Sequence, residues 1–190
     1  NFFTNTLTGT SVAIDGYFVT ADTFRLNGNL WAWGRNTDGQ LGDNTTTNRT
    51  TPITTFAGGA NWKQVSCGFR HTAAIKTDGT LWAWGNNGNG PVGDNTGSPV
   101  TKPTPVTTFL GGTNWKQVAC GNQHTVAIKT DGTLWCWGYN AQGQLGDNTT
   151  TNRSTPVTTF LGGTNWKQVA GGYHTAAVDR KSTRLNSSHV

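Results

Sequence analysis

Short apolar segments recur along this chain, separated by stretches rich in glycine, asparagine and threonine. In the segment from Thr80 to Trp84, an extended strand would place Trp82 and Trp84 on one face and Leu81 and Ala83 on the other. Both faces are then apolar, so the strand should be covered on both sides. The pattern predicts short β-strands, each in a sheet that packs between two neighbouring layers.

The segment Leu-Trp-Ala-Trp-Gly occurs at 30–34 and again at 81–85, and it returns at 134–138 with Cys136 in place of the alanine. A period of about 50 residues indicates a tandem-repeat architecture. We therefore assign residues 20–178 to repeats, bounded as 30–80, 81–133 and an incomplete copy at 134–178.

Each copy contains the same series of turn and strand signals. A glycine-rich turn ending in Gly-Asp-Asn is followed by a threonine-rich loop, the sequence Asn-Trp-Lys-Gln-Val, a second glycine turn and a short strand that starts with His-Thr. Asp131-Gly132 between two strand-like segments predicts a tight hairpin. Each repeat should form a small antiparallel sheet, and the fold class is all-β. A β-propeller buries both faces of such sheets; an elongated solenoid is the alternative.

The tryptophans and histidines hold equivalent places in successive copies. A catalytic centre needs unlike groups that converge on one point, whereas a residue repeated by rotation occupies one similar place in every blade. We expect a structural role for these residues, and for the histidines a hydrogen-bonded place at the start of a strand. The set is Trp31, Trp33, Trp62, His71, Trp82, Trp84, Trp115, His124, Trp135, Trp137, Trp166 and His174.

Composition agrees with short strands and argues against several kinds of chemistry. The chain has 26 glycines and 9 tryptophans but only 12% charged residues. Aspartates in the Gly-Asp-Asn and Asp-Gly turns are explained by turn chemistry, and the sequence contains no glutamate. No nucleophile motif, phosphate loop or metal-ligand spacing is found. We predict no enzyme, no cofactor and no metal site.

The net charge of +5 does not indicate a nucleic-acid partner. Lysines recur once per repeat instead of clustering, as at Lys63, Lys116 and Lys167. No apolar segment is long enough to span a bilayer. The three cysteines lack the paired spacing of a zinc site and are predicted to be small buried residues.

A period of about 50 residues and a diglycine also suit kelch repeats. The finer pattern resembles the regulator of chromosome condensation repeat: the Trp-Ala-Trp-Gly segment, Gly39-Gln-Leu-Gly-Asp43, Trp62-Lys-Gln-Val-Ser-Cys-Gly68, then His71-Thr72 and Asp78-Gly79. This resemblance implies a propeller that typically has seven blades. The chain is then an arc of about three blades, monomeric within a larger protein.

Both ends depart from the repeat. Residues 1–19 are predicted to be a linker or the end of another domain, and the lack of methionine suggests that the start of the protein is missing. Thr20 to Asn29 aligns with His71 to Thr80, although Thr20 replaces the histidine. The repeat stops after Val178, and residues 179–190 resemble a translated sequencing adapter, so we expect them to have no native role.

Residues that differ between copies are the candidates for contact with a partner, because a repeated scaffold becomes specific through its exceptions. They are Arg35, Asp38, Phe69, Arg70, Asn86, Asn122, Gln123, Tyr139, Gln142 and Tyr173. Neutral surface variation is the alternative. The leading hypothesis is a non-catalytic propeller that binds another protein, on a secreted or virion surface. The family resemblance also implies guanine nucleotide exchange on a small GTPase, or inhibition of an enzyme.

Overall fold

The computed structural model describes residues 12–14, 17–19, 28–96 and 101–180 of the chain. Within these ranges every helix-or-strand element is a β-strand, which confirms the predicted all-β class. No helix in this part of the chain could cross a membrane. Most of the predicted linker at 1–19 and of the predicted tail at 179–190 lies outside the described residues.

Two antiparallel sheets have four strands each, in chain order. The first consists of β5 (Trp62–Cys67), β6 (His71–Lys76), β7 (Leu81–Asn86) and β8 (Thr101–Thr107). The second consists of β9 (Trp115–Cys120), β10 (His124–Lys129), β11 (Leu134–Gly138) and β12 (Arg153–Thr158). The hairpin predicted at Asp131-Gly132 joins β10 to β11, with Gly132 at φ 82°.

A two-stranded sheet stands on each side of this pair. One consists of β3 (Trp31–Gly34) and β4 (Arg49–Thr54), which correspond to the third and fourth strands of a complete sheet. The other consists of β13 (Trp166–Gly171) and β14 (Thr175–Asp179), which correspond to the first and second strands. A separate hairpin joins β1 (Val12–Ile14) to β2 (Tyr17–Val19).

The sheets are offset by half a period from the repeats read in the sequence. A sequence repeat that starts at the Trp-Ala-Trp-Gly strand supplies the last two strands of one sheet and the first two strands of the next. Each complete sheet therefore joins the second half of one copy to the first half of the following copy. The offset links neighbouring sheets covalently through every repeat.

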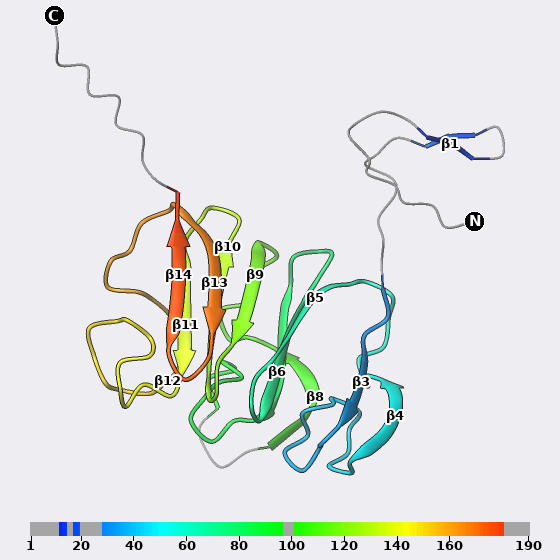
Figure 1. Ribbon diagram of the computed structural model, residues 1–190, viewed down its shortest axis with the longest axis horizontal. Coiled ribbons are helices and arrows are strands. Elements are labelled where there is room, and N and C mark those ends of the chain that lie inside the picture. Colours follow the sequence, from blue (N-terminus) through cyan, green and yellow to red (C-terminus); the bar gives the residue numbers. More distant parts are fainter. Residues whose placement is uncertain (1–11, 15–16, 20–27, 97–100, 181–190) are drawn as a thin grey trace, which may run out of the picture.

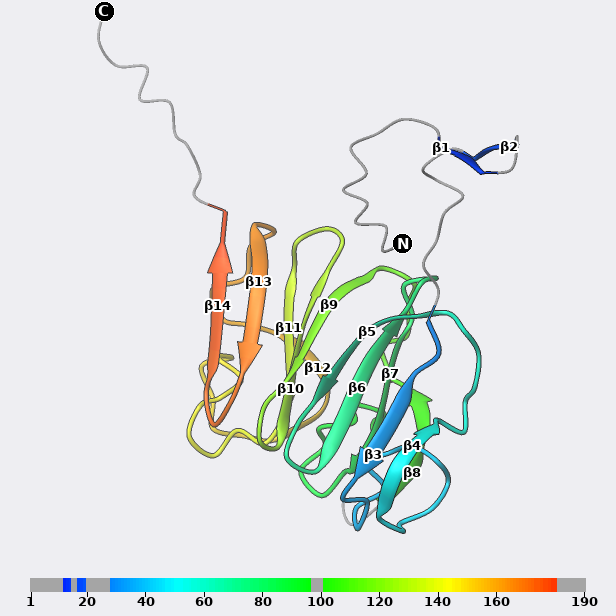
Figure 2. The ribbon, with the colours of Figure 1, turned by 45° about the vertical axis from the view of Figure 1, so that its right-hand side comes forward.

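The four sheets stand side by side in chain order (Figures 1 and 2). The first strands of successive sheets contact each other, β5 with β9 and β9 with β13, so they form the inner edge of the stack. Apolar side chains fill the space between sheets, including Ala73 and Ile75 of one sheet and Trp115 and Val118 of the next. No sheet pairs back onto the first within the described residues, so the stack is an open arc of propeller blades, as predicted.

Burial of a repeated residue depends on whether a neighbouring sheet covers it. Trp84 and Trp137 are fully buried, whereas the equivalent Trp33 is 60% exposed. The predicted burial of all three cysteines is wrong for Cys67, which is exposed, while Cys120 and Cys136 are buried. Cys120 packs against Ser66 of the preceding inner strand, and no preceding inner strand faces Cys67 in the described part of the chain. Burial raises the pKa of both Cys120 and Cys136 to about 12.

Candidate protein-contact surface

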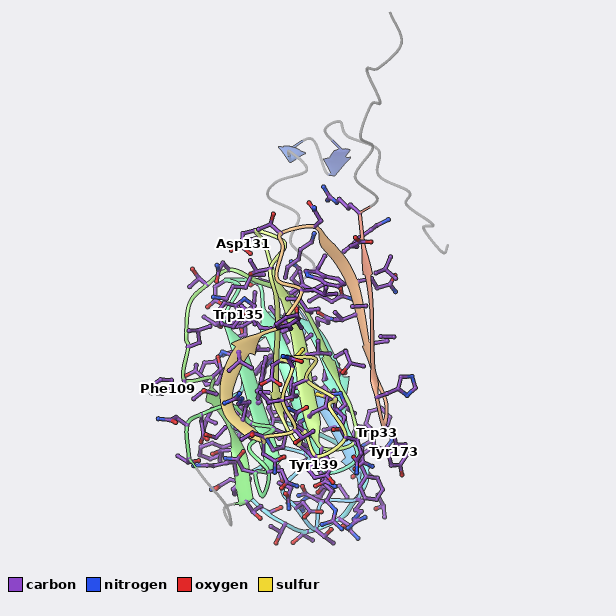
Figure 3. The ribbon with its side chains drawn as sticks, turned by 90° about the vertical axis from the view of Figure 1, so that its left-hand side faces the viewer. Trp33, Phe109, Asp131, Trp135, Tyr139 and Tyr173 are labelled. Atoms are coloured by element: carbon purple, nitrogen blue, oxygen red, sulfur yellow. The ribbon has the colours of Figure 1, made fainter. Side chains whose placement is uncertain are left out.

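All ten candidate contact residues lie at one end of the sheets. The turn from the first to the second strand and the long loop from the third to the fourth strand both emerge at this end, as between β5 and β6 and between β7 and β8. We call it the turn end. Figure 3 shows Tyr139 and Tyr173 at the turn end together with Trp33, opposite the end that carries Asp131.

Buried histidines hold the turns in place. His71 begins β6, and its Nε2 lies 2.9 Å from the hydroxyl of Thr125 in the next sheet. That hydroxyl donates its own proton to the carbonyl of Pro91, at 2.7 Å. His71 Nε2 must therefore be the donor to Thr125. Burial lowers the pKa of His71 to about 3, with a smaller contribution from His124, so the ring is neutral at physiological pH.

His124 repeats this arrangement one blade further along. Its Nε2 lies 2.9 Å from the Thr175 hydroxyl, which donates to the carbonyl of Gln144 at 2.8 Å. Burial lowers the pKa of His124 to about 4, and the charge of His174 adds to the effect. His174 itself is exposed. These histidines link blades and do not converge with an acid or a nucleophile.

Steric crowding explains why a glycine lies three residues before His71 and before His124. A Cβ on Gly68 would lie 2.7 Å from Nδ1 of His71 and 2.6 Å from the Gly121 carbonyl. Both distances are shorter than real contacts of a Cβ, so any side chain would push the histidine ring away from Thr125. The glycine keeps the turn thin and the ring in its place between the two sheets.

A buried asparagine and an aspartate organise each long loop. Asn36 is fully buried, and its amide donates to Asp43 at 3.0 Å while its oxygen accepts from the backbone of Leu41 at 2.9 Å. Asp43 also binds Arg49 at 2.6 Å. Burial alone would raise the pKa of Asp43, but hydrogen bonds from Thr45, Arg49 and Asn36 outweigh it and lower the pKa.

The same set recurs in the next two loops. Asn87 and Asn140 take the place of Asn36, and the ion pairs join Asp94 to Lys102 at 3.1 Å and Asp147 to Arg153 at 2.9 Å. The asparagine after each aspartate has a left-handed backbone, with φ of 64°, 61° and 61° at Asn44, Asn95 and Asn148. These contacts fix the backbone of each loop, so the variable side chains that it carries are held in defined positions.

Five of the candidate residues come together on the first two blades. Phe69 is 55% exposed, and the guanidinium carbons of Arg35 and Arg70 lie 5.8 and 5.7 Å from its ring centre. Arg35 also approaches Asp38 at 3.5 Å, and Asp38 accepts a hydrogen bond of 3.1 Å from the amide of Asn86. An exposed aromatic ring between two cations results, with the loop of one blade tied to the strand of the next.

The other five candidates lie further along the same end. The Gln123 amide donates to Asn122 at 3.2 Å, and the Gln142 amide donates to the Tyr139 hydroxyl at 3.4 Å. Tyr173 is 81% exposed. A shallow hollow of about 270 Å³ runs between the turns and is lined by Phe69, Asn122 and Tyr173. The candidates thus form two groups connected by this hollow.

Asn89 also belongs to this surface, although it is not among the ten candidate residues. Its amide donates to Gln123 at 2.6 Å, and its oxygen accepts from Asn152 at 3.1 Å, so it connects two blades. The signal was present in the sequence, because Asn89 occupies the same place in its loop as Asp38 and Gln142. The exposed aromatic at the end of each fourth strand was also missed, as at Phe109, which lies away from the turn end (Figure 3).

Two lysines that recur in the repeats pack against tryptophans of their own sheets. The ammonium group of Lys76 lies 4.8 Å from the ring centre of Trp62 and 4.4 Å from that of Trp82. Lys129 makes the same pair of contacts with Trp115 and Trp135. These are cation–π contacts within a sheet. Among the described residues, no group of three His, Cys, Asp or Glu side chains could hold a metal ion.

Comparison with known proteins identifies the repeat. The model of the regulator of chromosome condensation (RCC1) repeat matches residues 27–75, 78–128 and 131–178. The chain belongs to the RCC1 repeat family. A second model of this repeat matches residues 62–90 and 115–144. The resemblance seen in the sequence is confirmed, and the kelch alternative is excluded.

Among relatives, the chain is 37% identical over 159 residues to the Ultraviolet-B receptor UVR8 of Arabidopsis thaliana, covering 80% of this chain and 35% of the receptor. Human WBSCR16 has a similar structure, with a TM-score of 0.69 at 22% identity, over 86% of this chain and 42% of that protein. Prp20p of Saccharomyces cerevisiae gives a TM-score of 0.67 at 21% identity, over 87% and 42%. The chain therefore spans less than half the length of each of these proteins, and the two structures confirm the propeller fold.

Proposed function

We propose that this chain is the part of an RCC1 propeller that binds another protein through its turn end, without catalysing a reaction. Phe69 carries the proposal, because its exposed ring lies between two arginine side chains at the turn end. Aromatic and arginine side chains are also the residues most enriched at protein interfaces.

The rigidity of the turns and loops at the turn end also supports a protein-binding role. The turns are fixed by buried histidines and the loops by Asn36 and its equivalents, so a partner would meet side chains that are already ordered. A surface ordered before binding loses less conformational entropy when the complex forms. Among family members with known structures, Prp20p was characterised for its binding properties to Gsp1p and histones. That observation belongs to Prp20p, and it supports the general role of a protein-binding propeller for this chain.

The charges at the turn end favour an acidic partner surface. Asp43 and Asp147 are paired with arginines of their own loops, and Arg35 lies 3.5 Å from Asp38. Arg70, whose guanidinium group faces Phe69, has no carboxylate within ion-pair distance among the described residues. A partner segment that combines a carboxylate with an apolar side chain would pair with Arg70 and cover the ring. Guanine nucleotide exchange, enzyme inhibition and a location on a secreted or virion surface stay predictions.

A binding comparison with matched variants tests the proposal. The chain, Phe69→Ala with Arg70→Ala, and the control Phe109→Ala are each immobilised and exposed to a lysate of the source cells. Proteins retained by the wild type and by Phe109→Ala, but lost from the double variant and released by salt, are the expected result. A set of retained proteins that does not change with the double variant would contradict binding at the turn end.

A further inference from the structure

A lysine is the second residue of the first strand in three successive sheets. Lys63, Lys116 and Lys167 each follow the tryptophan that begins β5, β9 or β13. In the sequence these lysines stand one repeat apart. The fold brings them together, because the first strands of successive sheets contact each other along the inner edge of the stack.

Each of these lysines is the extra residue of a β-bulge. The ladder between β9 and β10 passes from Trp115 to Gln117 and leaves Lys116 without a partner residue. The ladders of β5 and β13 skip Lys63 and Lys167 in the same way. A bulge gives up one step of strand pairing and re-aims the side chain of the extra residue. In all three strands that side chain is an exposed lysine.

The three bulges lie at one height in the stack. The backbone nitrogen of Trp115 donates to the carbonyl of Gly79 at 3.0 Å, and that of Trp166 donates to the carbonyl of Gly132 at 3.1 Å. The first strands β9 and β13 therefore begin beside the Asp-Gly hairpin of the preceding sheet. We call this end of the sheets, which carries Asp131 in Figure 3, the hairpin end. The bulge lysines thus occupy equivalent places on neighbouring inner strands, at the end opposite the turn end.

The charges of these three lysines have no acidic partner within the described part of the chain. The ion pairs found there use other cations, namely Arg35, Arg49, Lys102 and Arg153. The hairpin residues Asp78 and Asp131 accept hydrogen bonds from threonines of their own turns, and neither is within ion-pair distance of a bulge lysine. The chain contains no glutamate that could take this role.

The balance of charge at the hairpin end is positive in both complete sheets. Each sheet contributes two lysines and one aspartate there: Lys63, Lys76 and Asp78 in the first, and Lys116, Lys129 and Asp131 in the second. Lys76 and Lys129 lie against tryptophan rings, which leaves the bulge lysines to reach a ligand. Like charges held at one height repel each other, and an anion placed between them relieves the repulsion.

We propose that Lys63, Lys116 and Lys167 bind one small anion that carries several phosphate groups, at the hairpin end of the inner edge. Lysine binds phosphate as a compact point charge with three rotatable donors. Residues of neighbouring first strands have Cα atoms within 8 Å of each other, so one compact molecule can span their lysines. A nucleic-acid duplex spreads its phosphates along its length, whereas these lysines gather on the inner side of an arc.

This site is distinct from the protein-contact surface. The bulge lysines lie at the hairpin end, and the exposed ring of Phe69 with its two arginines lies at the turn end. The inference therefore goes beyond the proposed function and does not depend on it. Partner binding could fail while phosphate binding persists, and the reverse also holds.

Isothermal titration calorimetry with inositol hexakisphosphate tests the site. Lys63→Gln with Lys116→Gln removes two charges from the hairpin end and should raise the dissociation constant at least tenfold. Arg35→Gln with Arg70→Gln removes two charges from the turn end and should change it less than twofold. Lys63→Arg with Lys116→Arg keeps the charges and should retain most of the affinity. Absence of binding by the wild-type chain, or an equal loss in the two charge-matched variants, would overturn the proposal.

A short DNA duplex, titrated at the same phosphate concentration, tests the class of ligand. The duplex should bind at least tenfold more weakly than inositol hexakisphosphate. Equal or tighter binding of the duplex would overturn the assignment to a small anion.

Lysine labelling in the wild-type chain tests the location without any substitution. An amine-reactive reagent is applied with and without inositol hexakisphosphate, and the modified peptides are measured by mass spectrometry. The ligand should slow modification of Lys63 and Lys116 at least threefold and leave Lys102, which is paired with Asp94, unchanged. Equal protection of all three lysines, or no protection of Lys63 and Lys116, would contradict binding at the hairpin end.

Discussion

Acidification should destabilise the chain through His71, well above the pH at which its carboxylates are protonated. The ring is neutral, fully buried and bonded to Thr125, and its pKa falls from 6.5 to about 3 on folding. Above pH 6.5 neither the folded nor the unfolded state binds the proton. Below pH 6.5 the unfolded state binds it and the folded state does not, so stability decreases as the pH falls from 6.5 toward 3.

The magnitude follows from the size of the shift. The free energy of unfolding changes by about 1.4 kcal/mol per pH unit while only the unfolded state is protonated. Between pH 6.5 and pH 4, His71 therefore removes about 3 kcal/mol of stability. His124 acts in the same range, to a smaller extent because its pKa falls less far, to about 4. Asp43 and Asp147 affect stability at lower pH than the histidines do. Folding lowers their pKa, so their contribution to stability is present above pH 3.8 and is lost as the pH falls below it.

Urea unfolding followed by tryptophan fluorescence at pH 7, 5.5 and 4.5 measures this dependence. His71→Gln retains an amide that can donate to Thr125 but cannot be protonated. Its stability should fall less steeply with pH than that of the wild type, by about 1.4 kcal/mol per pH unit below pH 6. His174→Gln, at an exposed histidine of the same repeat position, should follow the wild type. Equal slopes for His71→Gln and the wild type would refute the assignment of a buried neutral ring.

Three further predictions concern the frame that supports the turn end. Trp84→Ala removes a fully buried indole and its bond to Gln40 and should lower the free energy of unfolding by about 3–5 kcal/mol in urea titrations. Gly68→Ala should lower the free energy of unfolding by about 1–3 kcal/mol, because the added Cβ would collide with His71. Gly172→Ala changes the same repeat position and should be neutral, because the nearest atom to its added Cβ lies 3.9 Å away. Asp43→Ala should cost about 1–3 kcal/mol, because it removes the acceptor that Asn36, Thr45 and Arg49 share, and it should increase hydrogen exchange in its loop. Asp131→Ala in an exposed hairpin should have a smaller effect.

The strands, the hairpins and the stacking of sheets could be predicted from the sequence, because short sequence segments determine them. Two-sided apolar strands, Asp-Gly hairpins and the return of Trp-Ala-Trp-Gly lead to stacked antiparallel sheets. The offset between repeats and sheets was not predicted, because the repeats were bounded at the Trp-Ala-Trp-Gly strand, whereas the pairing of β7 with both β6 and β8 places that strand inside a blade. The exposure of Cys67 and Trp33 could not be predicted either. Their local sequences match those of buried equivalents, and only the neighbouring sheet differs.

The candidate surface was predictable in its location but not in its internal contacts. Phe69 and its neighbours could be identified from the sequence, because positions that differ between copies stand out against the constant positions of the repeat. The bond from His71 to Thr125 spans two sheets, and no local pattern indicates it. The bonds of Asn89 with Gln123 and Asn152 likewise join two blades, although its variable position in the loop is visible in the sequence. Contacts between blades join residues that only the folded stack brings together.

Site-specific photocrosslinking tests the central claim most directly. A photoreactive phenylalanine analogue is placed at Phe69 in one sample and at Phe109 in another, two exposed aromatic positions in different parts of the blades. Binding through the turn end predicts a covalent adduct with a partner protein from position 69, at least tenfold more abundant than from position 109 and suppressed by salt. Equal adducts from both positions, or adducts from position 109 alone, would contradict the assignment of the turn end as the protein-binding surface.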